Sequence, residues 1–177
     1  MKLFYFLLLM MFSLSILSQT IPDSLKGIIV IDKERVLKSD LDLDLYVYYY
    51  AEANQHYYAG HYKKAYKMYS KLFDSDPYNY NFNYRLGLCF YKRGLYNSAL
   101  YYFSYAAECI NPNYLNSIYE NGVPPIIFSY LGDIYCLINA DYPVEFFYKK
   151  YLEYITDENI RSEVELKIKN CKKPWTN

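Results

Sequence analysis

Residues 86–106 read LGLCFYKRGLYNSALYYFSYA and contain the pattern that decides the fold. Within this stretch, the segment from Gly94 to Ala99 reads G-x-Y-x-x-A, and the same pattern runs from Gly60 to Ala65, 34 residues earlier. Each Gly is expected to form the turn between two helices, because glycine readily adopts a left-handed backbone conformation. One helical hairpin cannot bury its apolar face alone, so the repeat predicts about three stacked hairpins.

Small residues recur where two paired helices must approach each other closely. Ala53 aligns with Gly87, Ala65 aligns with Ala99, and Gly132 is the corresponding small residue of a later stretch. Small side chains leave room for a neighbouring helix, and the chain's 26 Tyr and 10 Phe are then expected to fill the grooves between helix pairs.

The pattern resembles the tetratricopeptide repeat, a 34-residue helix–turn–helix unit. The second copy carries the family's signature most completely, at Leu86, Gly87, Phe90, Gly94, Tyr96, Ala99, Phe103 and Ala106. The first copy departs from it at Glu52 and His56, where Leu and an aromatic residue are usual. A weaker third copy begins at Pro125, and there Val144 replaces the usual Ala and Asn139 replaces the turn Gly. The resemblance implies an all-α fold, a right-handed superhelical solenoid of antiparallel helix pairs.

The repeat alignment divides residues 44–177 into hairpins, an insertion and a last helix. The predicted parts are repeats at about 46–79, 80–112 and 125–156, an insertion at 113–124 and a capping helix at 157–171. We expect the insertion to form a short helical turn and then a loop. Insertions in solenoids often serve binding, although a plain surface loop is the alternative. The last helix has apolar residues that are expected to close the core, at Ile160, Val164, Leu166 and Ile168.

The first 20 residues, MKLFYFLLLMMFSLSILSQT, have the layout of a secretory signal peptide. Lys2 precedes an apolar run, and small polar residues follow it. We predict a signal peptide at 1–18, cut after Ser18, and an N-terminal extended arm at 19–43. The alternative is an uncleaved anchor, although the apolar run is shorter than the roughly 20 residues of a membrane-spanning helix. The sequence therefore predicts an exported protein of the periplasm, or one associated with the outer membrane, in a Gram-negative bacterium.

Four cysteines are present, at Cys89, Cys109, Cys136 and Cys171. Export permits disulfides, and four cysteines allow three pairings. Their spacings fit no disulfide framework that we recognise, so we expect buried thiols that pack as small apolar side chains. The sequence has no Cys-x-x-Cys motif and no Cys/His cluster, which argues against a metal site.

Composition and motifs argue against an enzyme and against a nucleic-acid-binding protein. Lys and Arg together number 19, as do Asp and Glu, so the formal net charge of zero gives little support for phosphate contacts. No phosphate-binding loop, nucleophile elbow or zinc-protease motif occurs. Of the two histidines, His56 is expected to pack in the core, and His61 lies in a turn without an evident partner. We therefore predict no catalytic residue, no metal and no cofactor.

The tetratricopeptide resemblance also implies where a partner would bind. In that family, the first helix of each pair lines the concave side of the superhelix. The corresponding positions hold mainly aromatic and amide side chains, at Tyr50, Asn54, Tyr57, Asn81, Tyr84, Arg85, Tyr91, Tyr130 and Asp133. Only Asn54 matches the clamp with which some family members hold a C-terminal carboxylate, so that function is rejected. The alternative is that these tyrosines merely cover the core.

We therefore expect a non-enzymatic protein–protein interaction module or scaffold of the bacterial cell envelope, such as a subunit of a secretion or outer-membrane-associated assembly. Its partner would be another protein or an extended peptide segment, with no nucleic acid involved, because tyrosines suit stacking and hydrogen bonding. It would meet a membrane only through the signal peptide or an envelope complex. Two alternatives are a self-associating structural solenoid and an accessory protein that binds glycan or peptidoglycan on its tyrosine rings.

Overall fold

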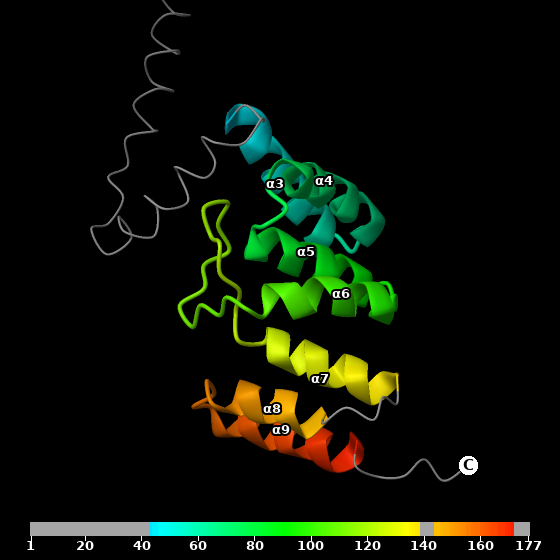
Figure 1. Ribbon diagram of the computed structural model, residues 1–177, viewed down its shortest axis with the longest axis vertical. Helices are drawn as coiled ribbons and strands as arrows, with labels where there is room; N and C mark the ends of the chain where they lie inside the picture. Colours follow the sequence, from blue (N-terminus) through cyan, green and yellow to red (C-terminus); the bar gives the residue numbers. More distant parts are fainter. Residues whose placement is uncertain (1–42, 139–143, 172–177) are drawn as a thin grey trace, which may run out of the picture.

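The computed structural model describes residues 43–138 and 144–171, and its regular elements in these ranges are all α-helices. The seven helices of this part of the chain are α3 (Leu43–Tyr58), α4 (Tyr62–Ser75), α5 (Tyr80–Tyr91), α6 (Tyr96–Ala106), α7 (Ile127–Leu137), α8 (Val144–Leu152) and α9 (Glu158–Cys171). Each helix packs against the next one, so the helices form a stack in sequence order (Figure 1). The predicted all-α fold is confirmed.

The predicted N-terminal segments fall outside the described ranges. The signal peptide at 1–18 lies outside them, and so does the arm at 19–43 apart from Leu43 at the start of α3. Asn139, the predicted turn residue of the third repeat, lies outside them as well. Within residues 43–138 and 144–171, no helix combines the length and the apolar character that crossing a membrane requires. Export therefore stays a prediction.

Two glycines form the turns within the first two helix pairs, as predicted. Gly60 lies between α3 and α4 with a φ of 77°, and Gly94 lies between α5 and α6 with a φ of 71°. Both angles are left-handed, and glycine adopts them without the steric cost that a Cβ atom imposes. The start of α5 is fixed by a cap, because the Asn79 side chain accepts a hydrogen bond from the Phe82 N–H at 3.1 Å.

The small residues of the repeat lie where paired helices touch. Three alanines of the alignment are fully buried, namely Ala53, Ala65 and Ala99. A Cβ atom on Gly87 would lie 2.5 Å from the ring of Phe103 on α6, and one on Gly132 would lie 2.8 Å from the ring of Tyr148 on α8. A larger residue at either glycine would therefore force the paired helices apart.

One helix, α5, is buried on nearly all sides. Nine consecutive residues, from Asn81 to Cys89, are buried, whereas a solenoid helix usually keeps one polar face in water. Helices α4 and α6 pack against α5, and the insertion covers its polar side at Asn81 and Arg85. Figure 1 shows the insertion as a loop beside the ends of α5 and α6. It contains turns but no helix, so the predicted helical turn is wrong.

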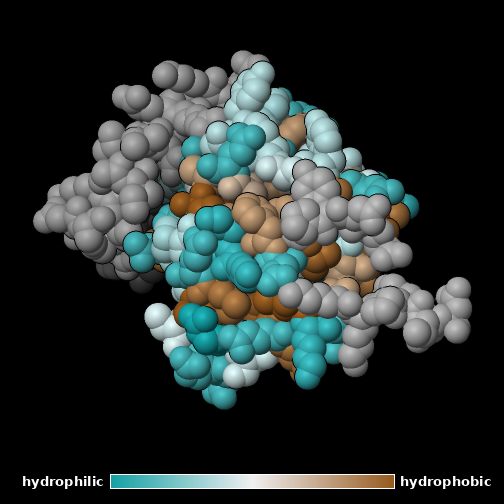
Figure 2. All heavy atoms as spheres, turned by 60° about the horizontal axis from the view of Figure 1, so that its bottom comes forward, coloured by the Kyte–Doolittle hydropathy of each residue, from teal (hydrophilic) through white to brown (hydrophobic). Residues whose placement is uncertain are grey.

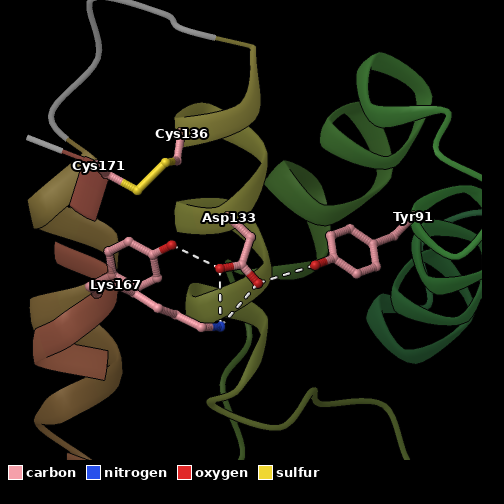
Figure 3. A network of polar contacts seen from close by, with 6 residues as sticks. Tyr91, Asp133, Cys136, Lys167 and Cys171 are labelled. Carbon is pink, nitrogen blue, oxygen red and sulfur yellow. Dashed lines mark hydrogen bonds and ion pairs between the residues drawn. A yellow bond between two sulfur atoms is a disulfide. The ribbon is translucent and has the colours of Figure 1, made fainter. Parts of the chain in front are cut away.

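A disulfide that the sequence analysis did not predict holds the C-terminal end. Cys136 in the last turn of α7 is bonded to Cys171 at the end of α9, with their Cα atoms 5.7 Å apart (Figure 3). The expectation of buried thiols is wrong for this pair, because α8 and α9 fold back onto α7 and bring together two cysteines 35 residues apart. Cys89 is a buried thiol, and burial raises its pKa to about 12.

Helix α9 closes the stack with a narrower apolar face than predicted. Val164 is buried, and Ile168 packs in the same cluster with Tyr148. Ile160 and Leu166 are exposed instead, at 39% and 56%. Leu166 lies two positions from both Val164 and Ile168, and at 3.6 residues per turn this spacing places it on the other side of the helix.

Candidate functional site

The nine candidate residues fall mainly into two polar clusters and one aromatic group. The first cluster, here the Arg85 cluster, consists of Tyr50, Tyr58, Asn81, Arg85, Tyr114 and Asn116. The second cluster, here the Asp133 network, consists of Tyr91, Asp133, Tyr148 and Lys167. Both are centred on the first helix of a pair, and they differ in what surrounds the central charge.

Arg85 is a buried cation that has only neutral acceptors among the described residues. It is 4% exposed. Its Nη2 donates to the Tyr114 hydroxyl at 2.6 Å and to Asn116 Oδ1, and its Nε has no hydrogen-bond partner among the residues that the structure describes. No carboxylate in the described ranges forms an ion pair with it. A buried guanidinium is normally paired with an anion, and the described part of the chain does not supply one to Arg85.

The rest of the Arg85 cluster fastens the insertion to α3 and α5. The Tyr114 hydroxyl donates to Asn81 Oδ1 at 2.8 Å. Asn116 accepts from the Tyr50 hydroxyl at 2.7 Å and donates to the Tyr58 hydroxyl at 2.8 Å. Burial raises the pKa of Tyr114 well above its usual value, so this phenol stays protonated and able to donate.

The insertion is a loop with internal support of its own. Glu120 is buried, and its carboxylate accepts from the Gly122 N–H at 2.8 Å, from Asn111 Nδ2 at 3.0 Å and from the Leu115 N–H at 3.2 Å. Backbone hydrogen bonds close its base, where the Asn111 N–H donates to the Val123 carbonyl at 2.8 Å. These bonds involve no residue of α3 or α5, so they support part of the loop's shape independently of the Arg85 cluster.

Asp133 joins four helices (Figure 3). The Tyr148 hydroxyl of α8 donates to Oδ1 at 2.7 Å, and the Tyr91 hydroxyl of α5 donates to Oδ2 at 3.1 Å. Lys167 of α9 places its Nζ 3.1 Å from Oδ1 and 3.3 Å from Oδ2. Burial, together with this carboxylate, raises the pKa of Tyr91 and of Tyr148. Both oxygens of Asp133 are thus occupied by contacts within the fold.

Two further candidate tyrosines, Tyr84 and Tyr130, join Tyr91 in an aromatic group around Phe103. Tyr130 stacks on Phe103 with ring centroids 5.6 Å apart, and Tyr91 lies 4.9 Å from Tyr130. Tyr84 lies 6.0 Å from Phe103 and is 5% exposed. Core packing therefore accounts for Tyr84, whereas Tyr57, Tyr91 and Tyr130 are half-buried and keep part of their surface accessible.

Sequence reasoning missed the residues that complete both clusters. Tyr114 and Asn116 come from the insertion, and Lys167 comes from the capping helix. The polar, aromatic composition of the insertion was the available signal, but no periodicity could indicate where the loop would lie. Asn54, the one match to the clamp, accepts from the Tyr69 hydroxyl at 2.9 Å and therefore bridges α3 and α4.

A surface pocket shares no lining residue with either cluster. It has a volume of about 510 Å³ and is lined by Gly60, His61, Tyr62, Lys63, Lys64, Lys67 and Arg93. Its four basic side chains give it positive charge. The ring of His61 lies 6.0 Å from the ring of His56, so these two histidines meet. Among the residues that the structure describes, no three His, Cys, Asp or Glu side chains gather in a way that could hold a metal.

Apolar side chains stay exposed on the last three helices. Figure 2 brings the α9 end forward and shows hydrophobic patches between hydrophilic side chains. Leu137 on α7, Phe146 on α8 and Leu166 on α9 are each more than half exposed, at 53%, 51% and 56%. Exposed apolar residues favour association with another protein when they form a continuous patch.

Comparisons with known proteins agree with the fold. The sequence matches no protein-family model and no curated protein. The type III secretion chaperone SycD of Yersinia enterocolitica, in complex with a peptide of the translocator YopD, is similar with a TM-score of 0.59 and 21% identity, and the match covers 75% of this chain and 96% of that chain. PcrH from Pseudomonas aeruginosa is similar with a TM-score of 0.57 and 20% identity over 76% of this chain and 97% of that chain. Such identities show the fold alone, that of a tetratricopeptide-type α-solenoid.

Proposed function

We propose that this protein is a non-enzymatic protein-interaction module that binds an extended peptide segment of another protein along α3, α5 and α7. The observation that carries the proposal is the Arg85 cluster, where α3 and α5 already hold an irregular segment of this chain through side-chain hydrogen bonds. The similar SycD structure contains a peptide of a translocator protein. A solenoid provides an extended surface of this kind from successive repeats.

The chemistry of this surface suits a peptide. Tyr57, Tyr91 and Tyr130 offer partly accessible rings, and Arg85 supplies a buried cation that the insertion covers in this structure. Tyr and Arg are enriched among the residues that dominate binding energy at protein interfaces, because they combine large contact area with directed hydrogen bonds. A partner would be held by stacking and hydrogen bonds, with one charged contact.

We propose that the protein works after export, in the periplasm or at the outer membrane, within a secretion or envelope assembly. Two features support this location. Residues 1–18 have the layout of a signal peptide. Cys136 and Cys171 form a disulfide, and such bonds persist in oxidising compartments such as the periplasm. Cell fractionation, with alkylation of thiols before lysis, tests this location: a protein recovered reduced in the cytoplasm would contradict it.

Site-specific photocrosslinking tests the binding surface. A photoreactive phenylalanine analogue replaces Tyr58 on α3, which is 69% exposed, in the full chain expressed in its host. The matched control replaces Tyr101 on α6, which is 72% exposed. We expect an intermolecular crosslink to another protein from position 58 and none from position 101. Crosslinks from position 101 alone would move the interface to the second helices of the pairs.

Self-association is the second candidate function, and the exposed Leu137, Phe146 and Leu166 favour it. Light scattering over a range of protein concentrations tests it. A mass that doubles with concentration and falls back in the Phe146→Ser variant would support a homodimer through the last helices. A constant monomer mass would leave the peptide-binding function as the one to pursue.

A further inference from the structure

The tip of the insertion contacts α3 and α5 through its side chains, as a bound peptide would. Asn116 is exposed, yet its side chain hydrogen-bonds Arg85, Tyr50 and Tyr58. Two residues earlier, the Tyr114 hydroxyl lies between Arg85 and Asn81. A plain surface loop would leave its amide side chains to water. Here two side chains, spaced as in Tyr-x-Asn, enter one polar cluster on two helices.

The neighbouring backbone adds to these contacts. Asn81 Nδ2 donates to the Ser117 carbonyl at 3.3 Å, and the Tyr80 N–H donates to Asn121 Oδ1 at the same distance. Tyr114 also meets the ring of Tyr84 edge to face, with centroids 6.1 Å apart. Helices α3 and α5 thus bind the segment Tyr114–Ser117 by a ring contact, by side-chain hydrogen bonds and by a hydrogen bond to one main-chain carbonyl. Proteins recognise extended peptides through contacts of these kinds.

Among the described residues, the Arg85 guanidinium lacks the anionic hydrogen-bond acceptor that a buried cation usually has. It is buried, and within residues 43–138 and 144–171 its Nε has no partner and its two acceptors are a phenol and an amide. Hydrogen bonds between ionised partners are roughly twice as strong as neutral ones. A carboxylate in the place of the Asn116 amide would therefore bind more strongly than the amide does.

We propose that the segment Tyr114–Ser117 is an internal stand-in for a partner, and that α3 and α5 recognise an extended peptide with an aromatic residue followed two positions later by Asn or, preferably, Asp. This inference rests on the proposed function. The partner segment competes with the insertion for the Arg85 cluster. Departure of the insertion preserves the hydrogen bonds of Glu120 and the closed base of the loop, because these do not involve α3 or α5. It also uncovers Ile118 and Tyr119, which pack against the core of α3, α4 and α5.

The test uses a synthetic peptide of residues 113–120, NYLNSIYE, blocked at both ends. The receptor is the full chain with Tyr114→Ala and Asn116→Ala, which weaken the internal competitor. Fluorescence anisotropy of the labelled peptide should show binding at least about tenfold tighter to this double variant than to the wild type, because a hydrogen bond to a charged group is worth roughly a factor of ten or more. The Asn113→Ala variant, at an exposed position of the same loop, should bind like the wild type.

The acceptor preference is tested with the same peptide carrying Asn116→Asp. The double variant should bind the Asp peptide about tenfold more tightly than the Asn peptide. A receptor with Tyr50→Phe in addition should lose affinity for both peptides, since the hydroxyl that donates to Asn116 is gone while the ring remains. A peptide with Ala in place of both Tyr114 and Asn116 is the negative control.

A second measurement requires no peptide. The Asn116→Asp change in the intact chain should raise the midpoint of thermal unfolding at neutral pH by about 2–4 °C, because Arg85 gains an anionic partner. Pairing lowers the folded-state pKa of the new carboxyl. The gain is therefore full above its unfolded pKa of about 4 and is lost as the pH falls through the lower folded value. Asn113→Asp, in the same loop, should give no such gain.

The proposal is wrong if a folded double variant binds neither peptide, or binds both no better than the wild type does. It is also wrong if Asn116→Asp destabilises the intact chain at neutral pH. Photocrosslinking from position 58 to another protein would survive either result, since Tyr58 is 69% exposed and a partner could contact it without displacing the insertion from Arg85. Failure of this inference and failure of the proposed function can thus be told apart.

Discussion

The Arg85 cluster and the Asp133 network each surround one charged side chain within the fold, and they differ in the partners that this charge has. Each centres on one charged residue of the first helix in a pair, on α5 and on α7. Asp133 has a cation within 3.1 Å, and all its partners come from helices. Arg85 has no carboxylate partner in the described ranges, and both its acceptors come from a loop. The Asp133 network therefore stabilises the packing of helices, whereas in the Arg85 cluster an anionic acceptor can replace a neutral one.

The disulfide strengthens this contrast. Figure 3 shows Cys136 and Cys171 on the same two helices that Asp133 and Lys167 connect. The C-terminal part of the stack is therefore held by a covalent bond, an ion pair and two phenol hydrogen bonds. The insertion is held to α3 and α5 by noncovalent contacts alone among the described residues. We expect stability to depend on the Asp133 network and binding to depend on the Arg85 cluster.

The largest effect is expected from removing α9. Deleting residues 157–177 removes Lys167, Cys171 and the apolar contact of Val164, and it exposes Tyr148 and Tyr151 of α8. The truncated chain should aggregate or fail to unfold cooperatively, because a solenoid requires a closed end. Size-exclusion chromatography and a thermal melt measure this. A monomer with a cooperative transition would show that α9 is not a cap.

Loss of the disulfide should have the next largest effect. Replacing both Cys136 and Cys171 by Ser should lower the free energy of unfolding by about 2–4 kcal/mol, because the closed loop no longer restricts the unfolded chain. Denaturant unfolding measures the change, and a reductant should bring the wild type to the same value. Peptide binding by the Tyr114→Ala, Asn116→Ala receptor should be unchanged. Equal stability with and without the bond would contradict the structural role given to it.

A smaller loss is expected when Asp133 becomes Asn. The amide keeps one acceptor for the Tyr148 hydroxyl but cannot pair with Lys167, so we expect a loss of about 1–2 kcal/mol. Lys167 is partly exposed, and water then compensates for part of the ion pair. Urea unfolding of this variant and of Lys167→Met, each alone and combined, separates the pair from the other contacts. Additive losses would show that the two side chains do not interact.

The smallest effect on stability is expected at Arg85. Replacing it by Met removes a buried charge without an anionic partner and retains much of its volume, so stability should stay within about 1 kcal/mol of the wild type or rise. Tyr114 and Asn116 keep Asn81 and Tyr50 as partners. In the Tyr114→Ala, Asn116→Ala receptor, the added Arg85→Met change should lower the affinity for the Asp peptide to that for the Asn peptide. A loss of stability larger than that of Asp133→Asn would reverse the comparison between the clusters.

The sequence predicted the parts of this molecule that repeat. Gly60 and Gly94 lie in the turns that the period of 34 residues predicts, and Gly87 lies against Phe103, as small residues at paired positions imply. Helix pairing follows from local pattern, because each hairpin is built from residues close in sequence. Recognition of the repeat was therefore sufficient for the fold class.

The parts that do not repeat could not be predicted in this way. The disulfide joins residues 35 apart, and the contact between Tyr50 and Asn116 joins residues 66 apart. Such contacts depend on where a loop or a final helix comes to lie, and neither position is encoded in a hydrophobic period. Ile160 shows the same limit, since it lies four positions before the buried Val164 and is nevertheless exposed, whereas the helical period itself places Leu166 on the other side of α9. Among these features, the position of the insertion on α5 affects the candidate site most, because it covers Asn81 and Arg85.

The burial of α5 along Asn81–Cys89 has a consequence for the exchange of its amide protons with solvent. A helix enclosed on every side exchanges its central amides only when much of the fold opens. Part of that enclosure comes from the insertion, so the protection of α5 reports whether something is seated on its polar side. A peptide that replaces the insertion should leave the amides of α5 slow and make those of residues 114–117 fast. Hydrogen–deuterium exchange would thus distinguish a partner that displaces the loop from one that binds beside it.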